Sequence, residues 1–149
     1  APVFLKKLWD DPSDTLGAGG VPMIMEKNPM GSDTSRKAIG EFVRRLRGAE
    51  GDNLLRVVLF GSLARGEARE DSDVDVFVLL KEYDRTGAEK AAIKDRIFAI
   101  ASAVEDLNDR KVYISPLIRS EATYMKNRRA SMIYYDIADE GILLYEKDA

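Results

Sequence analysis

Two aspartates, Asp73 and Asp75, stand one residue apart at the start of the apolar segment DVDVFVLL, residues 73–80. Side chains of a β-strand alternate between its two faces, so both carboxylates point the same way, with Cα atoms about 6.5–7 Å apart. Carboxylates at this separation raise each other's pKa unless a cation lies between them, and Mg²⁺ or Mn²⁺ favours such oxygen ligands. The pattern indicates a metal site, although by spacing alone a polar turn before a strand is the simpler interpretation.

The apolar residues of the same segment favour a site over a solvated turn. Phe77 and Leu79 continue the aspartate face as an apolar wall, whereas the intervening valines face the other way. We therefore expect the two acids at one end of a buried strand, where catalytic groups can be held rigidly.

A second polar feature, Gly61-Ser62, ends the preceding apolar run LLRVVLF, residues 54–60. Glycine lets a phosphate approach the backbone closely, and free N–H groups and the serine hydroxyl add donors, so the pair predicts an anion site; a tight turn with a helix cap is the alternative. Arg65, one turn further on, would reach the same phosphates. Its alternative role is a surface ion pair with a nearby acid: Glu67, Glu70 or Asp71.

Regular patterns that can position these residues begin near Ser35. The chain is predicted to form helices from Ser35 to Gly48 and over 62–67, 86–107 and 120–138, and strands over 54–60, 73–80, 111–118 and 142–146. Asp33 or Ser35 would cap the first helix, and Pro116 places its strand at a sheet edge or a bulge. This order predicts an α+β (α/β) fold in which helices cover a small sheet.

The composition fits one domain and excludes several chemistries. The 149 residues are 45% hydrophobic and 33% charged, and the net charge of −3 argues against non-specific binding to nucleic acid. The absence of Cys and His excludes disulfides, thiol catalysis, Ser-His-Asp hydrolysis and zinc sites of the usual kind. We expect an irregular arm over 1–34, a folded domain over 35–149, and, without an apolar run of membrane length or a signal peptide, a cytoplasmic location.

The segment GSLARGEAREDSDVDVFV, residues 61–78, resembles the signature of the DNA polymerase β-type nucleotidyltransferase superfamily, and its minimal nucleotidyltransferase branch most closely. The resemblance is strong over 54–80, is weaker further on, and does not extend to 1–34. It rests on these residues: Gly61, Ser62, Ala64, Arg65, Gly66, Ser72, Asp73 and Asp75.

This resemblance implies a mixed sheet with flanking helices and the transfer of a nucleoside monophosphate from a nucleoside triphosphate, usually ATP, to an acceptor hydroxyl. It implies that Gly61 and Ser62 hold the β- and γ-phosphates and that Asp73 and Asp75 bind two Mg²⁺ ions, which activate the acceptor oxygen and steady the leaving pyrophosphate. It also implies a helical HEPN-type toxin as the protein partner, as in antitoxins of this branch.

The sequence departs from the family in one respect. Active members commonly carry a third carboxylate on the next strand, but KVYISPLI (111–118) has none, and Tyr113 stands about where that acid would be. Asp109 is the nearest substitute, and Glu121 is more remote. The departure puts catalysis in doubt more than nucleotide binding.

Three functions follow from these patterns: an antitoxin-like nucleotidyltransferase, a degenerate module that binds a nucleotide or a partner without turnover, and a small-molecule transferase of the aminoglycoside-modifying kind. The third has least support, because such enzymes usually carry a further substrate-binding domain. A homodimer through the arm or an exposed sheet edge is compatible with the sequence.

Overall fold

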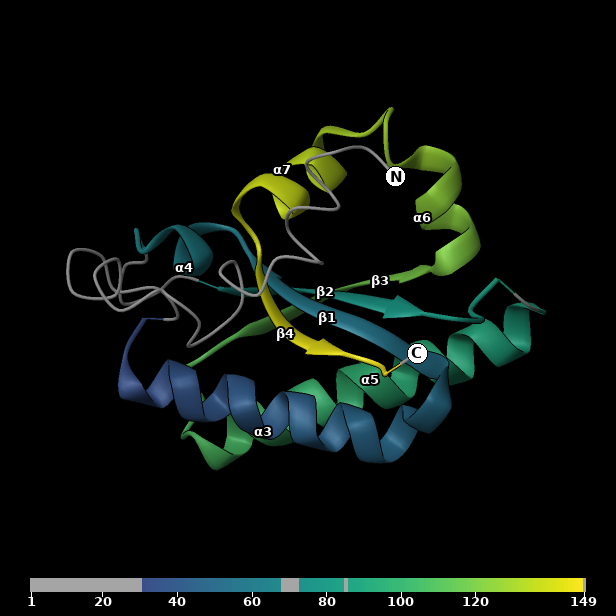
Figure 1. The fold of residues 1–149 in the computed structure, drawn as a ribbon. Helices are drawn as coiled ribbons and strands as arrows, with labels where there is room; N and C mark the ends of the chain where they lie inside the picture. Colours follow the sequence, from purple (N-terminus) through teal and green to yellow (C-terminus); the bar gives the residue numbers. More distant parts are fainter. Residues whose placement is uncertain (1–30, 68–72, 85, 149) are drawn as a thin grey trace.

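The computed structural model describes residues 31–67, 73–84 and 86–148 (Figure 1). In chain order these residues form α3 (Asp33–Glu50), the short 3₁₀ helix η2 (Gly51–Asn53), β1 (Leu54–Phe60), α4 (Ser62–Arg65), β2 (Val74–Leu80), α5 (Gly87–Leu107), β3 (Ile114–Ser120), α6 (Glu121–Asn127), α7 (Met132–Glu140) and β4 (Ile142–Glu146). None of these helices combines the length and the apolar composition needed to cross a membrane.

The described strands form one mixed sheet of four strands in the order β3-β2-β1-β4. β1 is antiparallel to both β2 and β4, whereas β2 and β3 are parallel. Parallel neighbours need a long crossover connection, and α5 provides it. The predicted fold class, a small mixed sheet flanked by helices, is confirmed.

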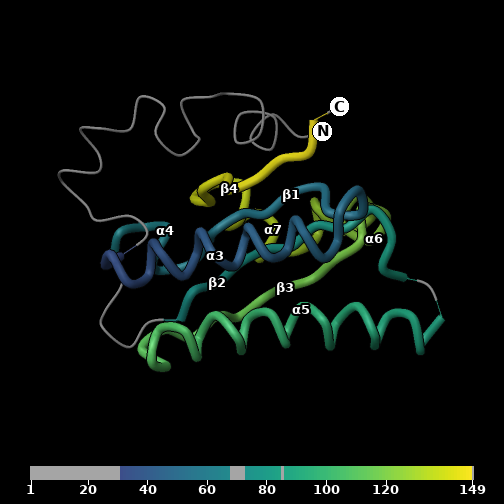
Figure 2. Tube along the Cα trace, turned by 90° about the horizontal axis from the view of Figure 1, so that it is seen from below, coloured from purple at the N-terminus to yellow at the C-terminus, as the bar shows by residue number. Residues whose placement is uncertain are grey.

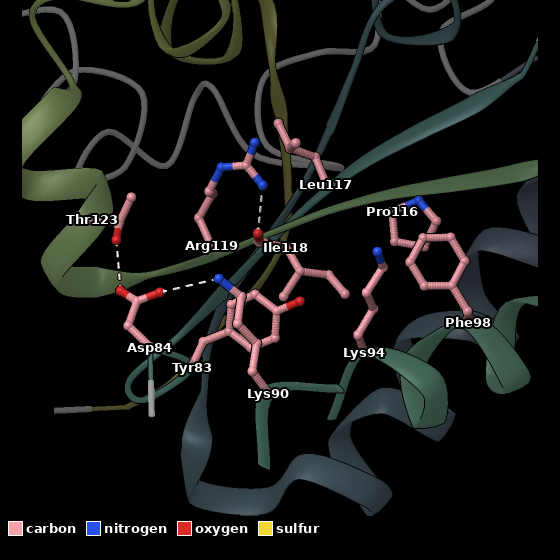
Figure 3. A pocket seen from close by; sticks show the side chains of 10 residues that line it. All are labelled: Tyr83, Asp84, Lys90, Lys94, Phe98, Pro116, Leu117, Ile118, Arg119 and Thr123. Atoms are coloured by element: carbon pink, nitrogen blue, oxygen red, sulfur yellow. Dashed lines mark hydrogen bonds and ion pairs between the residues drawn. The ribbon is translucent and has the colours of Figure 1, made fainter. Parts of the chain in front are cut away.

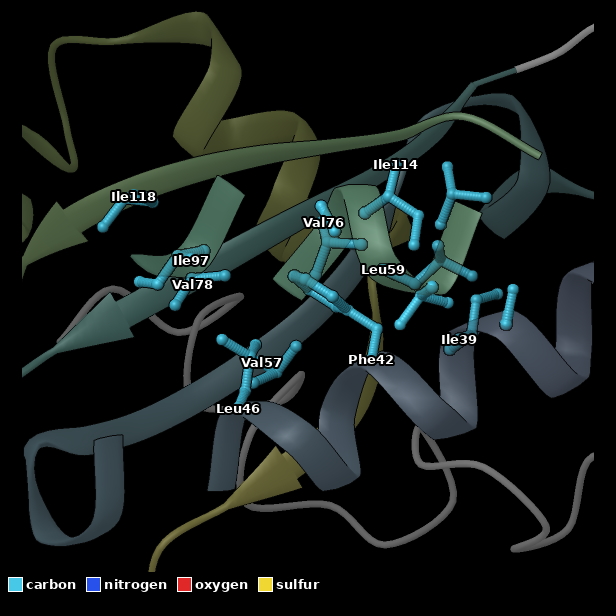
Figure 4. Packing of buried hydrophobic residues seen from close by; sticks show 14 of the residues in the cluster. Ile39, Phe42, Leu46, Val57, Leu59, Val76, Val78, Ile97, Ile114 and Ile118 are labelled. Carbon is cyan, nitrogen blue, oxygen red and sulfur yellow. The ribbon is translucent and has the colours of Figure 1, made fainter. Parts of the chain in front are cut away.

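Helices cover both faces of the sheet. α3 and α5 lie side by side along one face, and α6 and α7 lie on the other (Figures 1 and 2). The larger core, between the sheet and α3 and α5, is built from apolar side chains that include Phe42, Leu46, Val57, Val76 and Ile97 (Figure 4). On the opposite face, the rings of Phe77, Tyr124 and Tyr134 pack with centroids 5.2–6.0 Å apart.

The ends of several elements differ from the sequence-based prediction. α3 is capped by Ser32, whose Oγ accepts the Ser35 N–H at 3.2 Å, and not by Asp33 or Ser35. α4 ends at Arg65 and not at residue 67, because Gly66 adopts a left-handed conformation. β3 begins at Ile114, three residues later than expected, after a turn in which Asp109 and Arg110 have positive φ.

The single helix predicted over 120–138 is two helices. Ser120 caps α6 as expected, with its Oγ accepting the Thr123 N–H at 3.0 Å. At the other end of α6, the Asn127 side chain donates to the Thr123 carbonyl, and Ser131 is extended before α7 begins. Almost all of the predicted arm over 1–34 lies outside the described residues, so the domain boundary at 34/35 stays a prediction.

Candidate active site

The two aspartates stand at the start of β2, as the sequence predicts. Asp73 precedes the strand and is exposed, and Asp75 is its second residue and half-buried. Val74, Val76 and Val78 point into the core with α3 and α5. Phe77 and Leu79 point into the core with α6 and α7, so the alternation puts both carboxylates on this second face.

The environment of Asp75 disfavours its charged form. Burial raises the pKa of the Asp75 carboxyl above its ordinary value, and the negative charge of Asp73 raises it further. The nearby guanidinium of Arg65 lowers the same pKa. A cation between the carboxylates would remove this repulsion.

Gly61 lies against the Asp75 carboxylate. The antiparallel register pairs Phe60 with Asp75, which brings the following residue, Gly61, beside the acid. A Cβ built on Gly61 would overlap Oδ2 of Asp75 and stand 3.3 Å from its Cγ. The backbone at Gly61 has φ 80° and ψ −160°, a region that essentially only glycine adopts. The structure therefore brings the Gly-Ser turn and the aspartate pair together. The sequence predicts this proximity only on the assumption that β1 and β2 are neighbouring strands, and the structure shows that they are.

Ser62 opens α4, a single helical turn. The Gly61 carbonyl accepts the Arg65 N–H at 3.1 Å, and the Ser62 carbonyl accepts the Glu67 N–H at 2.9 Å. No hydrogen bond joins the Ser62 hydroxyl to another described residue. Backbone hydrogen bonds thus hold the turn, and the hydroxyl remains available to a ligand.

Arg65 makes two ion pairs. Its Nε lies 3.1 Å from Glu67 and its Nη1 lies 2.8 Å from Glu140, the last residue of α7. The surface ion pair with Glu67 is therefore present, whereas Glu70 and Asp71 lie outside the described residues. Sequence reasoning missed Glu140, because 75 residues separate it from Arg65. No local pattern in the sequence indicates this pairing.

No described residue supplies the third carboxylate on β3. The parallel register places Ser115 beside Asp75, and the Val74 N–H donates to the Tyr113 carbonyl at 2.7 Å, which puts the exposed Tyr113 beside Asp73. Among the described residues, no group of three or more His, Cys, Asp or Glu side chains is arranged to hold a metal.

The two substitutes that the sequence offered lie at different ends of the sheet. Asp109 is in the turn that precedes β3, at the end where Asp73 and Asp75 stand, because β2 and β3 are parallel. Glu121 follows the last residue of β3 and lies at the opposite end. Glu121 is therefore excluded as a ligand beside the pair, whereas Asp109 lies at the same end of the sheet as the pair.

A family model and several known proteins are similar to this chain. The family model of the nucleotidyltransferase domain matches residues 36–144. A candidate protein adenylyltransferase of Methanocaldococcus jannaschii is 39% identical over 95 residues, which cover 64% of this chain and 84% of the relative. A second candidate protein adenylyltransferase of the same organism is 28% identical over 109 residues, which cover 73% of this chain and 96% of the relative.

Two solved structures are also similar to this chain. A minimal nucleotidyltransferase structure has 33% identity and a TM-score of 0.44, and covers 75% of this chain and 98% of its own. A chain of a toxin–antitoxin complex solved with AMP-PNP has 18% identity and a TM-score of 0.45, and covers 73% of this chain and 74% of its own. The match of the family model spans most of the chain and includes Gly61, Ser62, Asp73 and Asp75. This chain therefore belongs to the nucleotidyltransferase domain family.

Proposed function

We propose that the protein transfers AMP from ATP to a hydroxyl group of another protein and that the transfer depends on Mg²⁺. The observation that carries the proposal is the contact of Gly61 with Asp75, which joins the phosphate-binding turn to the aspartate pair. Membership in the nucleotidyltransferase domain family supports the reaction type. The names of the two relatives, both candidate protein adenylyltransferases, support AMP as the group and a protein as the acceptor.

Asp73 and Asp75 would hold the metal. Their donor set fits Mg²⁺ or Mn²⁺, because two carboxylates on one face of a strand leave the remaining positions to phosphate oxygens and water. Burial raises the pKa of the Asp75 carboxyl and the charge of Asp73 raises it further, and a bound cation would offset both effects. A bound Mg²⁺ supplies charge neutralisation at the reacting phosphate and at the leaving pyrophosphate.

Gly61, Ser62 and Arg65 would bind the β- and γ-phosphates. Gly61 exposes backbone without a side chain, Ser62 offers its hydroxyl, and Arg65 supplies positive charge close enough to lower the pKa of Asp75. In the reaction the acceptor oxygen bonds to the α-phosphorus, the bond from the α-phosphorus to the bridging oxygen breaks, and pyrophosphate and a proton are released. Positioning by this turn provides much of the acceleration expected in phosphoryl chemistry.

A second function, nucleotide or partner binding without turnover, is favoured by the missing acid on β3. Two carboxylates can anchor one metal–triphosphate complex, but among the described residues no third acid completes a metal-binding group with them, although Asp109 lies in the turn before β3. In this alternative the protein is an antitoxin-like scaffold that keeps its partner without adenylylating it.

The acceptor in the proposal is a tyrosine or other hydroxyl of a helical HEPN-type protein. Its support is the resemblance of residues 61–78 to minimal nucleotidyltransferases, a branch in which such partners occur. A partner of this kind delivers the hydroxyl from outside the domain, which is consistent with an aspartate pair at the rim of the sheet.

Calorimetric titration with a non-hydrolysable ATP analogue tests the site. We expect Mg²⁺-dependent binding by the wild-type protein and its loss in Asp73→Asn/Asp75→Asn. The matched control Asp95→Asn, which changes an exposed aspartate on α5, should bind as the wild type does. An intact wild-type protein that fails to bind the analogue with Mg²⁺ contradicts the proposal.

Pyrophosphate release in the presence of a candidate partner separates the two functions. Release that requires Asp73 and Asp75, with a mass increase of one AMP on the partner, identifies the transferase. Retention of the partner by Asp73→Asn/Asp75→Asn, without release by the wild type, identifies the scaffold.

A further inference from the structure

A cavity lies at the end of the sheet opposite Asp73 and Asp75. It has a volume of about 420 Å³ and lies between the outer edge of β3, the first half of α5 and the start of α6 (Figure 3). Tyr83 and Asp84, which line it, follow the last residue of β2, so nearly the whole strand separates it from the aspartates. Its volume is in the range of sites for small organic ligands.

The edge of β3 inside this cavity cannot accept another strand. Backbone groups alternate in direction along a strand, and because Tyr113 pairs with β2, residues 114, 116 and 118 face outward. The Ile114 N–H donates to the Glu105 carboxylate, and Pro116 has no N–H to offer. The Ile118 carbonyl already accepts a hydrogen bond from Nη1 of Arg119 at 2.7 Å. This edge is blocked against pairing, so the cavity suits a small ligand better than an extended peptide.

Positive charge gathers in the cavity although the chain as a whole has a net charge of −3. Lys90, Lys94 and Arg119 line it, with Asp84 as the acid among them. The carboxylate of Asp84 already accepts from the hydroxyls of Ser120 and Thr123 and lies 3.7 Å from Lys90.

Lys94 and Arg119, in contrast, form no ion pair with any carboxylate of the described residues. Two cations without an acidic partner match the two negative charges of a phosphate monoester better than the single charge of a carboxylate.

Aromatic rings adjoin the same cations. The Nζ of Lys94 lies 5.9 Å from the ring centroid of Phe98, and the Nζ of Lys90 lies 4.9 Å from that of Tyr83. Tyr83 is buried, but Phe98 is 43% exposed, which leaves part of its ring available to a flat partner beside the lysine.

We propose that this cavity binds a nucleoside monophosphate, with the phosphate on Lys94 and Arg119 and the base against Phe98. The inference goes beyond the proposed function and does not depend on it, because none of these residues belongs to the aspartate end of the sheet. The nucleotide would lie beside the C-terminal half of β3, and its binding would not require a metal ion.

Equilibrium binding of AMP in the presence of EDTA tests the proposal. The protein carries Asp73→Asn/Asp75→Asn, so that the candidate active site contributes no metal-dependent binding. We expect saturable binding that weakens about tenfold in Lys94→Gln and again in Arg119→Gln, because each charge-assisted hydrogen bond contributes about that factor. Phe98→Leu should weaken AMP several-fold and leave inorganic phosphate unaffected.

Controls separate this site from others. Lys37→Gln removes an exposed lysine of α3 and should leave AMP binding unchanged. Lys94 is exposed on a helix, so Lys94→Gln keeps the fold and remains informative even if Arg119→Gln destabilises the protein. Absence of saturable AMP binding, or binding that Lys94→Gln leaves unchanged, overturns the proposal. Equal affinity for AMP and inorganic phosphate also overturns it, because the ring then contributes nothing.

Discussion

Gly61 and Asp75 are in contact across the β1–β2 ladder, and a methyl group on Gly61 would overlap Oδ2 of Asp75. The same glycine has a backbone conformation that other residues rarely adopt. Gly61 is therefore required twice, once by its own φ and ψ and once by the side chain of its neighbour. Because of the contact with Asp75, the effect of a side chain at residue 61 on stability should depend on which residue stands at position 75.

The first prediction concerns this link. Gly61→Ala should lower the free energy of unfolding by about 1–3 kcal/mol, as expected for a non-glycine residue in a disfavoured backbone region. In an Asp75→Ala background the cost should be smaller, because the overlap with Oδ2 is gone while the backbone strain remains. Urea denaturation of the two single variants and the double variant measures the coupling. Strictly additive effects would show that the two residues do not interfere.

The second prediction is that Asp75 destabilises the metal-free protein at neutral pH. Its folded pKa lies above its ordinary value of 3.8, mainly because of burial, so the folded state binds the proton more tightly than the unfolded state does. The stability from protonated Asp75 is fully present below the unfolded pKa and is lost as pH rises through the folded pKa.

Asp75→Asn should therefore match the wild type at low pH and melt at a higher temperature once pH exceeds that window. Thermal melts across the acid range measure this difference. Adding Mg²⁺ with an ATP analogue should then stabilise the wild type and leave Asp75→Asn unchanged. A variant that is less stable than the wild type at neutral pH would show that the carboxylate is already compensated.

The third prediction concerns Glu140, which holds Arg65 at 2.8 Å. Glu140→Gln keeps an acceptor for the guanidinium but removes a negative charge beside the turn that we propose binds phosphate. ATP-analogue binding should tighten about two- to fivefold at low salt, in line with the small energy of a part-exposed ion pair. Calorimetry at two salt concentrations measures it, and the gain should shrink at high salt. Weaker binding would mean that Glu140 acts mainly by positioning Arg65.

The fourth prediction concerns the ion pair that ties α3 to α5. The side chain of Glu50 is 1% exposed and accepts two hydrogen bonds from Arg96, at 2.6 and 3.0 Å. Arg96→Ala leaves a buried carboxylate without its partner and should cost about 1–3 kcal/mol of unfolding free energy. Asp95→Ala, on the same helix but exposed, should cost far less.

The double variant Glu50→Gln/Arg96→Ala gives the internal check. Without the charge, the buried side chain no longer needs the guanidinium, so part of the stability lost in Arg96→Ala should return. A double variant as unstable as the sum of its parts would mean that Arg96 stabilises the protein by packing alone.

Local patterns predicted much of the candidate site. The alternation of Asp75 with its neighbouring valines, the Gly-Ser end of β1 and the capping role of Ser120 were all readable, because each depends on residues close together in the chain. The ends of elements were less predictable. The left-handed turn at Asp109 and Arg110 delays β3, and the side chain of Asn127 helps to end α6, and neither disturbs the apolar periodicity.

The sequence by itself determined which residues could do chemistry and on which face of their strand they lie, since spacing of two along a strand sets the direction of a side chain. Only the tertiary structure decided what those residues touch. The register of β1 and β2 brings Gly61 against Asp75, and the C-terminal end of α7 places Glu140 beside Arg65. The crossover through α5 assembles a cationic cavity at the far end of the sheet. These contacts join segments far apart in the chain, and local periodicity carries no information about which of them meet.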